Sequence, residues 1–191
     1  MPEICPLTLL QLRELYARRM VEDFPPDELK PLWMIERALD EGRYSCFGWF
    51  EGGEILAYAL FVRLGRTALF DYYAVRRDLR DSGVGSRFIR ALIEGPLAGM
   101  DCVLLEVDEP DEAPDERELD VRERRLRFYM KNGLRDTGAR ATVFGVAFRI
   151  LALPVGPMPG PEAARRVYSE LYRAMLPEKL YREQVHIRDF H

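Results

Sequence analysis

The stretch TALFDYYAVRRDLRDSGVGSRFIRALIE (residues 67–94) passes from an apolar strand pattern through a polar glycine loop into an amphipathic helix pattern. The strand pattern ends at Ala74 and Val75, and the apolar residues after the loop recur at helical spacing. The next apolar run, CVLLEV at residues 102–107, is nearly continuous, as expected of a strand covered on both faces. Strand, loop, helix and buried strand in this order predict a right-handed β-α-β crossover.

Apolar runs ahead of the crossover predict an antiparallel meander. They cover residues 44–50, 55–62 and 67–75, and the first two flank the glycine pair at 52–53, which supplies the positive φ of a tight hairpin. Apolar residues at helical spacing predict two helices within residues 8–42. The sequence therefore predicts helices followed by a meander and then the crossover.

The chain after the crossover continues with a charged stretch at residues 108–120, which we expect to precede a helix. A strand or strand pair follows over about residues 136–153, and prolines then interrupt the backbone before a last helix near residues 162–175. We therefore expect a mixed α/β domain over residues 1–155 and a helical extension over residues 156–191.

Composition narrows the classes of function. The 191 residues are 48% hydrophobic, which suits one domain with or without an extension, and the formal net charge of -4 provides no overall positive field for nucleic acid. The N-terminal run is amphipathic and contains Glu3, unlike a signal peptide, and no apolar run reaches the roughly 18 residues of a membrane span. Cys5, Cys46 and Cys102 form no C-x-x-C pattern. We expect a cytoplasmic protein without membrane or nucleic-acid partners.

The glycine loop has the properties of an anion site. Backbone N–H groups at a helix start are unpaired, and the helix dipole adds partial positive charge there. Gly83 and Gly85 would let a phosphate approach the main chain, and Arg80 could add charge. The stretch is neither a Walker A loop nor a full G-x-G-x-x-G fingerprint. From these residues alone, the loop either holds a pyrophosphate or only turns the chain.

Two motifs resemble those of one enzyme family. Residues 73–93, YAVRRDLRDSGVGSRFIRALI, are similar to motif A of the GCN5-related N-acetyltransferases, because Arg80, Gly83 and Gly85 match its Arg/Gln-x-x-Gly-x-Gly/Ala pattern. The sequence RLRFYMKNGLRDTG resembles the second motif of that family. The residues that match this second motif are Phe128, Tyr129, Gly133 and Leu134. The order of elements also matches over roughly residues 4 to 154.

The resemblance implies an acetyl-CoA-dependent N-acetyltransferase fold with helices on both faces of a mixed sheet. It implies direct attack of a primary amine on the thioester, without a metal. The pantetheine arm would pair with the backbone of Ala74 and Val75, and a main-chain N–H near Val75 would serve as an oxyanion donor. The pyrophosphate would bind the main-chain amides of Arg80, Asp81, Ser82, Gly83, Val84, Gly85 and Ser86.

The same resemblance implies an acid and a base. Tyr129 matches the tyrosine that protonates the departing thiolate. We favour Glu106 as the base, because some family members that acetylate protein N-termini carry Leu-Glu-Val with that glutamate as base. Asp71 is the second choice, and strand alternation would put it on the face of Tyr73 and Val75. Either carboxylate has a structural alternative, since Asp71 could pair with an arginine and Glu106 could end a strand at the solvent.

Other features leave alternatives open. The acidic stretch 108–120 is either a solvated loop, a cleft border that attracts a cationic amine, or a segment neutralised by arginines. His186 and His191 are the two histidines, so we expect no metal cluster. The last helix carries Tyr168 and Tyr172 and either covers the sheet or forms a homodimer. A second functional hypothesis is an inactive protein that binds coenzyme A as a sensor or assembly component.

Overall fold

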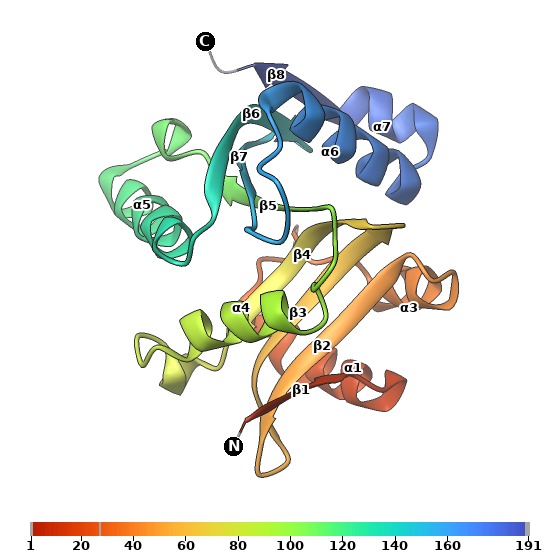
Figure 1. Cartoon of the computed structure of the whole chain (residues 1–191), viewed down its shortest axis with the longest axis vertical. Coiled ribbons are helices and arrows are strands. Elements are labelled where there is room, and N and C mark those ends of the chain that lie inside the picture. The colour runs from red at the N-terminus through yellow and green to blue at the C-terminus, as the bar shows by residue number, and fades with distance from the viewer. Residues whose placement is uncertain (1, 27, 190–191) are drawn as a thin grey trace.

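One eight-stranded sheet organises the chain (Figure 1), in a computed structural model that describes residues 2–26 and 28–189. The strand order is β1-β2-β3-β4-β5-β7-β6-β8, in which β4 and β5 run parallel and the other neighbours antiparallel. The strands are β1 (Glu3–Pro6), β2 (Tyr44–Glu51), β3 (Glu54–Leu64), β4 (Thr67–Val75), β5 (Cys102–Asp108), β6 (Arg135–Val143), β7 (Val146–Ala152) and β8 (Val185–Asp189). The predicted mixed α/β fold is confirmed.

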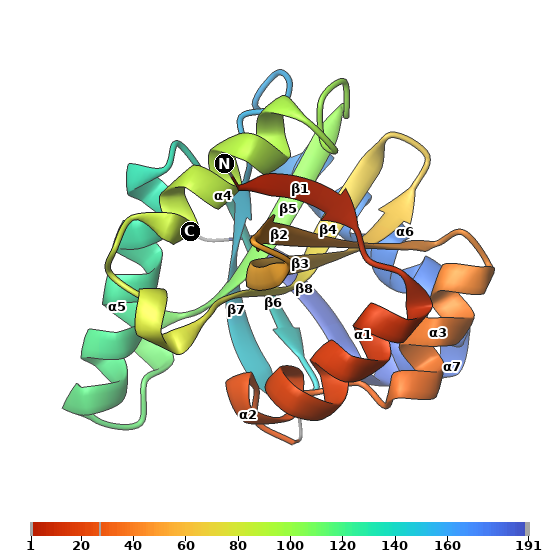
Figure 2. The same cartoon turned by 90° about the horizontal axis from the view of Figure 1, so that it is seen from below.

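Helices cover both faces of this sheet (Figure 2), and each face has its own hydrophobic core. The α-helices are α1 (Leu9–Leu15), α2 (Val21–Asp23), α3 (Leu32–Asp40), α4 (Val84–Glu94), α5 (Glu116–Lys131), α6 (Pro161–Met175) and α7 (Glu178–Gln184). A π-helical turn at Tyr16–Met20 joins α1 to α2, and short 3-10 turns lie at Arg77–Leu79 and Pro110–Glu112. Helices α4 and α5 pack on one face, and α1, α3 and α6 pack on the other.

The meander and the crossover have the predicted order. Strands β2, β3 and β4 pair as antiparallel neighbours, and α4 leads from β4 into β5. Gly52 and Gly53 turn the first hairpin with φ of 59° and 85°. Strand β1 was not predicted, because it is four residues long and pairs only with β2 at the sheet edge.

The acidic stretch 108–120 is only partly a loop, because the helix expected to follow it begins within it. Asp108 is the last residue of β5, and α5 begins at Glu116. The N–H of Glu118 donates to Asp115 Oδ1 at 2.8 Å, which caps the helix start. Glutamate and arginine are good helix formers, so this capped segment forms a helix despite its charge. Arginines pair with part of the stretch, since Arg125 contacts Asp108 and Arg149 contacts Glu109.

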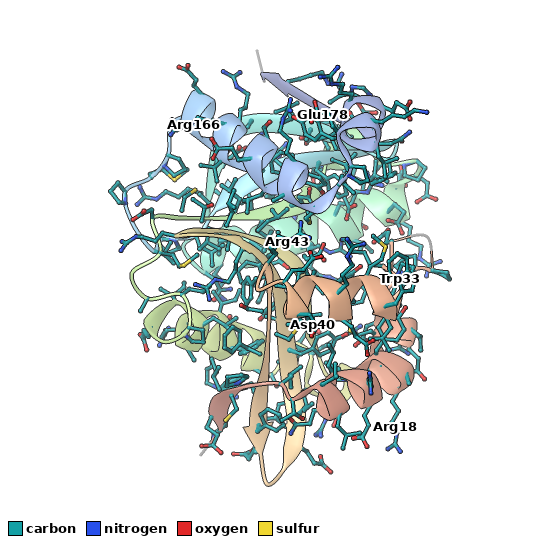
Figure 3. All side chains as sticks on the ribbon, turned by 90° about the vertical axis from the view of Figure 1, so that its right-hand side faces the viewer. Arg18, Trp33, Asp40, Arg43, Arg166 and Glu178 are labelled. Carbon is teal, nitrogen blue, oxygen red and sulfur yellow. The ribbon has the colours of Figure 1, made fainter. Side chains whose placement is uncertain are left out.

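The C-terminal segment adds to the same sheet. Helix α6 packs against β3, β4, β5 and β6, and β8 pairs with β6 as an edge strand. Arg43, labelled between α6 and α3 in Figure 3, donates to the carbonyl oxygen of Ala174 near the end of α6. The alternative in which α6 covers the sheet is therefore the one that the structure shows. The division into a domain at 1–155 and an extension at 156–191 stays a prediction.

Candidate active site

The two parallel strands separate halfway along their length. The paired residues of β4 and β5 run from Thr67 and Cys102 to Phe70 and Leu105. Beyond that last pair, β4 pairs only with β3 and β5 only with β7. The facing edges of the two strands therefore have no strand partner within the described residues, and Ala74 and Val75 belong to the open part of β4. Figure 1 shows the two groups of strands diverging there.

A β-bulge in β4 decides where Asp71 points. Strand β3 pairs Leu60 with Tyr72 and Phe61 with Phe70, so Asp71 is the extra residue between them. A bulge interrupts the alternation of faces. Tyr72 therefore packs in the α1, α3 and α6 core, whereas Tyr73 packs with α4 and α5.

The side chain of Asp71 lies on the α1, α3 and α6 face, where the O–H of Tyr44 donates to its Oδ2. The prediction that Asp71 shares the face of Tyr73 and Val75 is wrong. Strict alternation assumes an uninterrupted strand, and the bulge shifts the alternation by one residue.

Asp71 forms a nearly buried ion pair. Its side chain is 8% exposed, and Lys30 Nζ lies 2.5 Å from Asp71 Oδ1. The same Nζ lies 5.3 Å from the ring centroid of Tyr72. Burial disfavours the Lys30 ammonium, but the charge and hydrogen bond of Asp71, together with Tyr72 and Glu106, outweigh that effect, so the pKa of Lys30 is raised. The structural alternative for Asp71, an ion pair, is present, with a lysine in place of an arginine.

Glu106 lies on the same face of the sheet as Asp71. The phenols of Tyr168 and Tyr172, both on α6, donate to its Oε1, the latter at 2.6 Å. Burial raises the pKa of Glu106 and the negative charge of Asp71 adds to that effect, whereas the two phenol donors and Lys30 oppose it. Glu106 is thus a partly buried, hydrogen-bonded carboxylate under α6 rather than a solvated strand end.

Tyr129 lies on the opposite face, in the core formed with α4 and α5. Its ring centroid is 6.2 Å from that of Tyr73 on the open part of β4. Within residues 2–26 and 28–189 its hydroxyl makes no hydrogen bond. Burial raises the pKa of Tyr129 to about 12, with Arg125 lowering it and Asp108 raising it. The acid candidate and the two base candidates thus lie on opposite faces beside the separated strands.

The glycine loop ends in an uncapped helix start. Asp81 and Gly83 have positive φ angles of 61° and 80°, and no side chain caps α4. In the part of the chain that the structure describes, the N–H groups of Val84, Gly85 and Ser86 have no hydrogen-bond acceptor. Unpaired N–H groups at a helix N-terminus can bind an anion.

Two side chains of the loop point elsewhere. Arg80 donates to Asp23 Oδ1 at 3.1 Å and to the Val75 carbonyl oxygen at 3.3 Å, and the Ser82 hydroxyl donates to the Leu79 carbonyl oxygen at 2.5 Å. The anion-binding capacity of the loop therefore lies in its backbone.

Gly85 has a packing role as well. A Cβ built there would lie 3.0 Å from Phe128 Cζ, 3.2 Å from Tyr73 Oη and 3.3 Å from Val75 Cγ2. The Tyr73 hydroxyl also donates to the Gly85 carbonyl oxygen at 2.8 Å. The absent side chain lets α4 begin directly against β4 and α5.

Sequence reasoning missed the partners of both carboxylates. Lys30 lies 41 residues from Asp71, and Tyr168 and Tyr172 lie 62 and 66 residues from Glu106. The helical spacing of the two tyrosines indicated a shared face, but nothing in the sequence showed what that face contacts.

Residues 2–26 and 28–189 contain neither a candidate metal site nor a candidate membrane-spanning helix. No three histidine, cysteine, aspartate or glutamate side chains are grouped so that they could hold a metal ion. No helix in this part of the chain combines the length and apolar character needed to span a bilayer.

The first of the two separated parallel strands leads into an uncapped helix start. The chain belongs to the acetyltransferase (GNAT) family, whose model matches residues 9–115. Among curated protein sequences, none matches this chain.

Solved structures share the fold. A GNAT-family protein from Bacteroides thetaiotaomicron has a TM-score of 0.66 at 18% identity and covers 91% of this chain and 95% of its own. The ribosomal-protein-S18-alanine N-acetyltransferase from Escherichia coli has a TM-score of 0.58 at 22% identity, with 84% and 97% covered. A GNAT family acetyltransferase from Elizabethkingia anophelis with acetyl-CoA bound has a TM-score of 0.52 at 14% identity, with 80% and 97% covered.

Proposed function

We propose that this protein transfers the acetyl group of acetyl-CoA to a primary amine by direct attack, without a metal. The observation that carries the proposal is the separation of β4 and β5 directly after Phe70 and Leu105. Two carboxylates border that opening on one face of the sheet and Tyr129 borders it on the other. A thioester placed between the strands would thus have a base and an acid on opposite sides.

The donor would bind along β4 and the start of α4. The open edge of β4 at Ala74 and Val75 offers backbone groups to the pantetheine arm, and the unpaired N–H groups of Val84, Gly85 and Ser86 offer donors to the pyrophosphate. A main-chain N–H near Val75 would polarise the thioester carbonyl. The structural neighbour with acetyl-CoA bound supports this class of donor.

Glu106 is the better base of the two carboxylates. Both oxygens of Asp71 already have donors, since the Lys30 ammonium binds Oδ1 and the Tyr44 hydroxyl donates to Oδ2. The raised pKa of Glu106 suits a group that must accept a proton near neutral pH. As the amine nitrogen bonds to the thioester carbonyl, Glu106 takes its proton. When the C–S bond breaks, Tyr129 protonates the thiolate.

The first test is isothermal titration calorimetry, in which acetyl-CoA is added to the parent protein and to a Ser86→Asp variant. Ser86 is the third residue of α4, where an aspartate favours the helix dipole, so the added charge should repel the pyrophosphate without unfolding the helix. Ala98→Asp places the same charge on an exposed residue beyond the other end of α4 and serves as the control. Binding by the parent and the control but not by Ser86→Asp would support the donor site.

A turnover assay then separates an enzyme from an inactive binder. Release of the coenzyme A thiol is followed with spermidine, kanamycin and a short peptide with a free N-terminal alanine as acceptors. Thiol release that depends on one of these amines supports acetyl transfer. Binding of acetyl-CoA without acetylation of any amine would favour the sensor or assembly protein instead.

A further inference from the structure

Helix α6 lies beyond residues 9–115, which the family model matches, yet it reaches the candidate base. It packs on the face of β4 and β5 that carries Asp71 and Glu106. Arg43 of the α3–β2 connection binds the carbonyl oxygen of Ala174 near the end of the helix, and Figure 3 shows this arginine between α6 and α3. The position of α6 over the site is thus fixed by contacts with the rest of the fold.

Two tyrosines project from α6 to one oxygen atom. Tyr168 and Tyr172 are four residues apart, so they lie on the same side of the helix, and their ring centroids are 4.8 Å apart. Tyr168 is fully buried and Tyr172 is 7% exposed. Both hydroxyls donate to Glu106 Oε1, and within the described residues no group donates to Oε2.

We propose that α6 is part of the catalytic apparatus, with Tyr168 and Tyr172 as positioning residues that fix Glu106 Oε1 and leave Oε2 to accept the proton of the attacking amine. This inference rests on the proposed acetyl transfer. The two hydrogen bonds to Oε1 restrain rotation of the carboxylate, so that Oε2 keeps a constant direction. A base held in this way is available at the same place in each turnover.

The charged and titratable groups around Glu106 come from three elements. Tyr168 and Tyr172 face it from α6, Asp71 from β4, and Lys30 from the segment before α3. Burial raises the pKa of each tyrosine well above its usual range, so both remain protonated donors while Glu106 titrates. Two donors on Oε1 stabilise the carboxylate, and their removal should raise the pKa of Glu106 further.

The test compares the parent with a Tyr168→Phe, Tyr172→Phe double variant, which keeps both rings and removes both donors. The single variant Tyr172→Phe serves if the double variant does not fold. Tyr181→Phe is the matched control, because it removes a phenol on α7 that pairs with the Ser169 hydroxyl at 2.7 Å. The readouts are kcat and KM for acetyl-CoA across pH, and a carbon-13 NMR titration of the Glu106 carboxyl, assigned with Glu106→Gln.

We expect kcat to fall by roughly tenfold or more in the double variant while KM for acetyl-CoA is retained. The acidic limb of the kcat profile and the Glu106 NMR titration should both move to higher pH. If the parent is active but the double variant has the same kcat, pH profile and Glu106 titration as Tyr181→Phe, the positioning role is wrong and the proposed acetyl transfer is unaffected. A parent that binds acetyl-CoA but acetylates none of spermidine, kanamycin or the alanine peptide would overturn the proposed function, and this role with it.

Discussion

Asp71 and Glu106 are equivalent residues on two parallel strands, since each directly follows the last pair, Phe70 and Leu105. Their side chains lie on the same face but have different partners. Asp71 is paired with the Lys30 ammonium, and Glu106 accepts hydrogen bonds from two phenols. Neighbouring carboxylates in different environments can take different roles. In the proposed reaction Asp71 keeps its structural ion pair with Lys30, and Glu106 exchanges the proton.

We expect Glu106→Gln to stabilise the fold increasingly as the pH rises. The folded state binds the Glu106 proton more tightly than the unfolded chain does, because burial raises its pKa. Glu106 therefore destabilises the fold progressively as the pH rises above the ordinary glutamate value of about 4.3. Urea unfolding across pH should show a higher free energy of unfolding in the variant than in the parent near neutral pH, and a smaller difference at acidic pH.

The control for this experiment is Glu112→Gln, which removes the same charge from an exposed side chain. Its stability difference from the parent should change little with pH. A Glu106→Gln variant whose gain is as large at acidic pH as at neutral pH would show that packing, rather than the ionisation of Glu106, causes the effect.

The Lys30–Asp71 pair should show strong coupling in a double-mutant cycle. Lys30→Met removes a donor from a carboxylate that is 8% exposed, so we expect a loss of roughly 1–3 kcal/mol in the free energy of unfolding. Asp71→Asn in the same chain should recover part of that loss. Arg66→Met, which breaks an ion pair with exposed Asp101, should cost less than about 1 kcal/mol. Equal losses of unfolding free energy in Lys30→Met and Arg66→Met would show that burial of Asp71 does not strengthen its ion pair.

Tyr129→Phe should lower activity without harming the fold. Its hydroxyl has no hydrogen-bond partner among the described residues, so its removal leaves no orphaned group. We expect the midpoint of thermal unfolding to stay within the error of the parent and kcat to fall by roughly a hundredfold at unchanged KM for acetyl-CoA. An unchanged kcat would mean that the thiolate leaves without help from Tyr129.

Gly85→Ala should disturb both stability and donor binding. The new Cβ would lie 3.0 Å from Phe128 Cζ, so the start of α4 or the Phe128 ring must shift. Overpacking of this kind costs about 1–3 kcal/mol. Urea unfolding and titration with acetyl-CoA measure the two effects. If Gly85→Ala binds acetyl-CoA more weakly but is as stable as the parent, Gly85 is needed for ligand binding and not for packing.

Truncation after Val155 tests the division of the chain. The deleted segment includes Tyr168 and Leu171, both fully buried in the core on the α1, α3 and α6 face. We expect residues 1–155 to lose cooperative thermal unfolding, because that face would be uncovered. Light scattering on the parent and the truncated chain shows whether the segment also joins two subunits. A truncated chain with a sharp unfolding transition would establish residues 1–155 as an independent domain.

Local patterns in the sequence determined most of the fold. Strand and helix periodicity, the glycine hairpin and the loop before α4 indicated the meander and the β-α-β crossover, because each depends on residues close together in the chain. The motifs around Gly83 and Tyr129 indicated the family for the same reason. The sequence also indicated Asp71 and Glu106 as candidate bases, but it did not show that their side chains have different partners.

Tertiary structure alone decided that difference. A one-residue bulge turns Asp71 to the face of Glu106, Lys30 reaches Asp71 from 41 residues away, and two tyrosines of α6 reach Glu106 from more than 60 residues away. Hydrogen bonds and ion pairs between distant segments have no local periodicity, and a bulge arises from pairing with a neighbouring strand. The side chains that surround the candidate base are therefore brought together only when the sheet and its C-terminal helix have assembled.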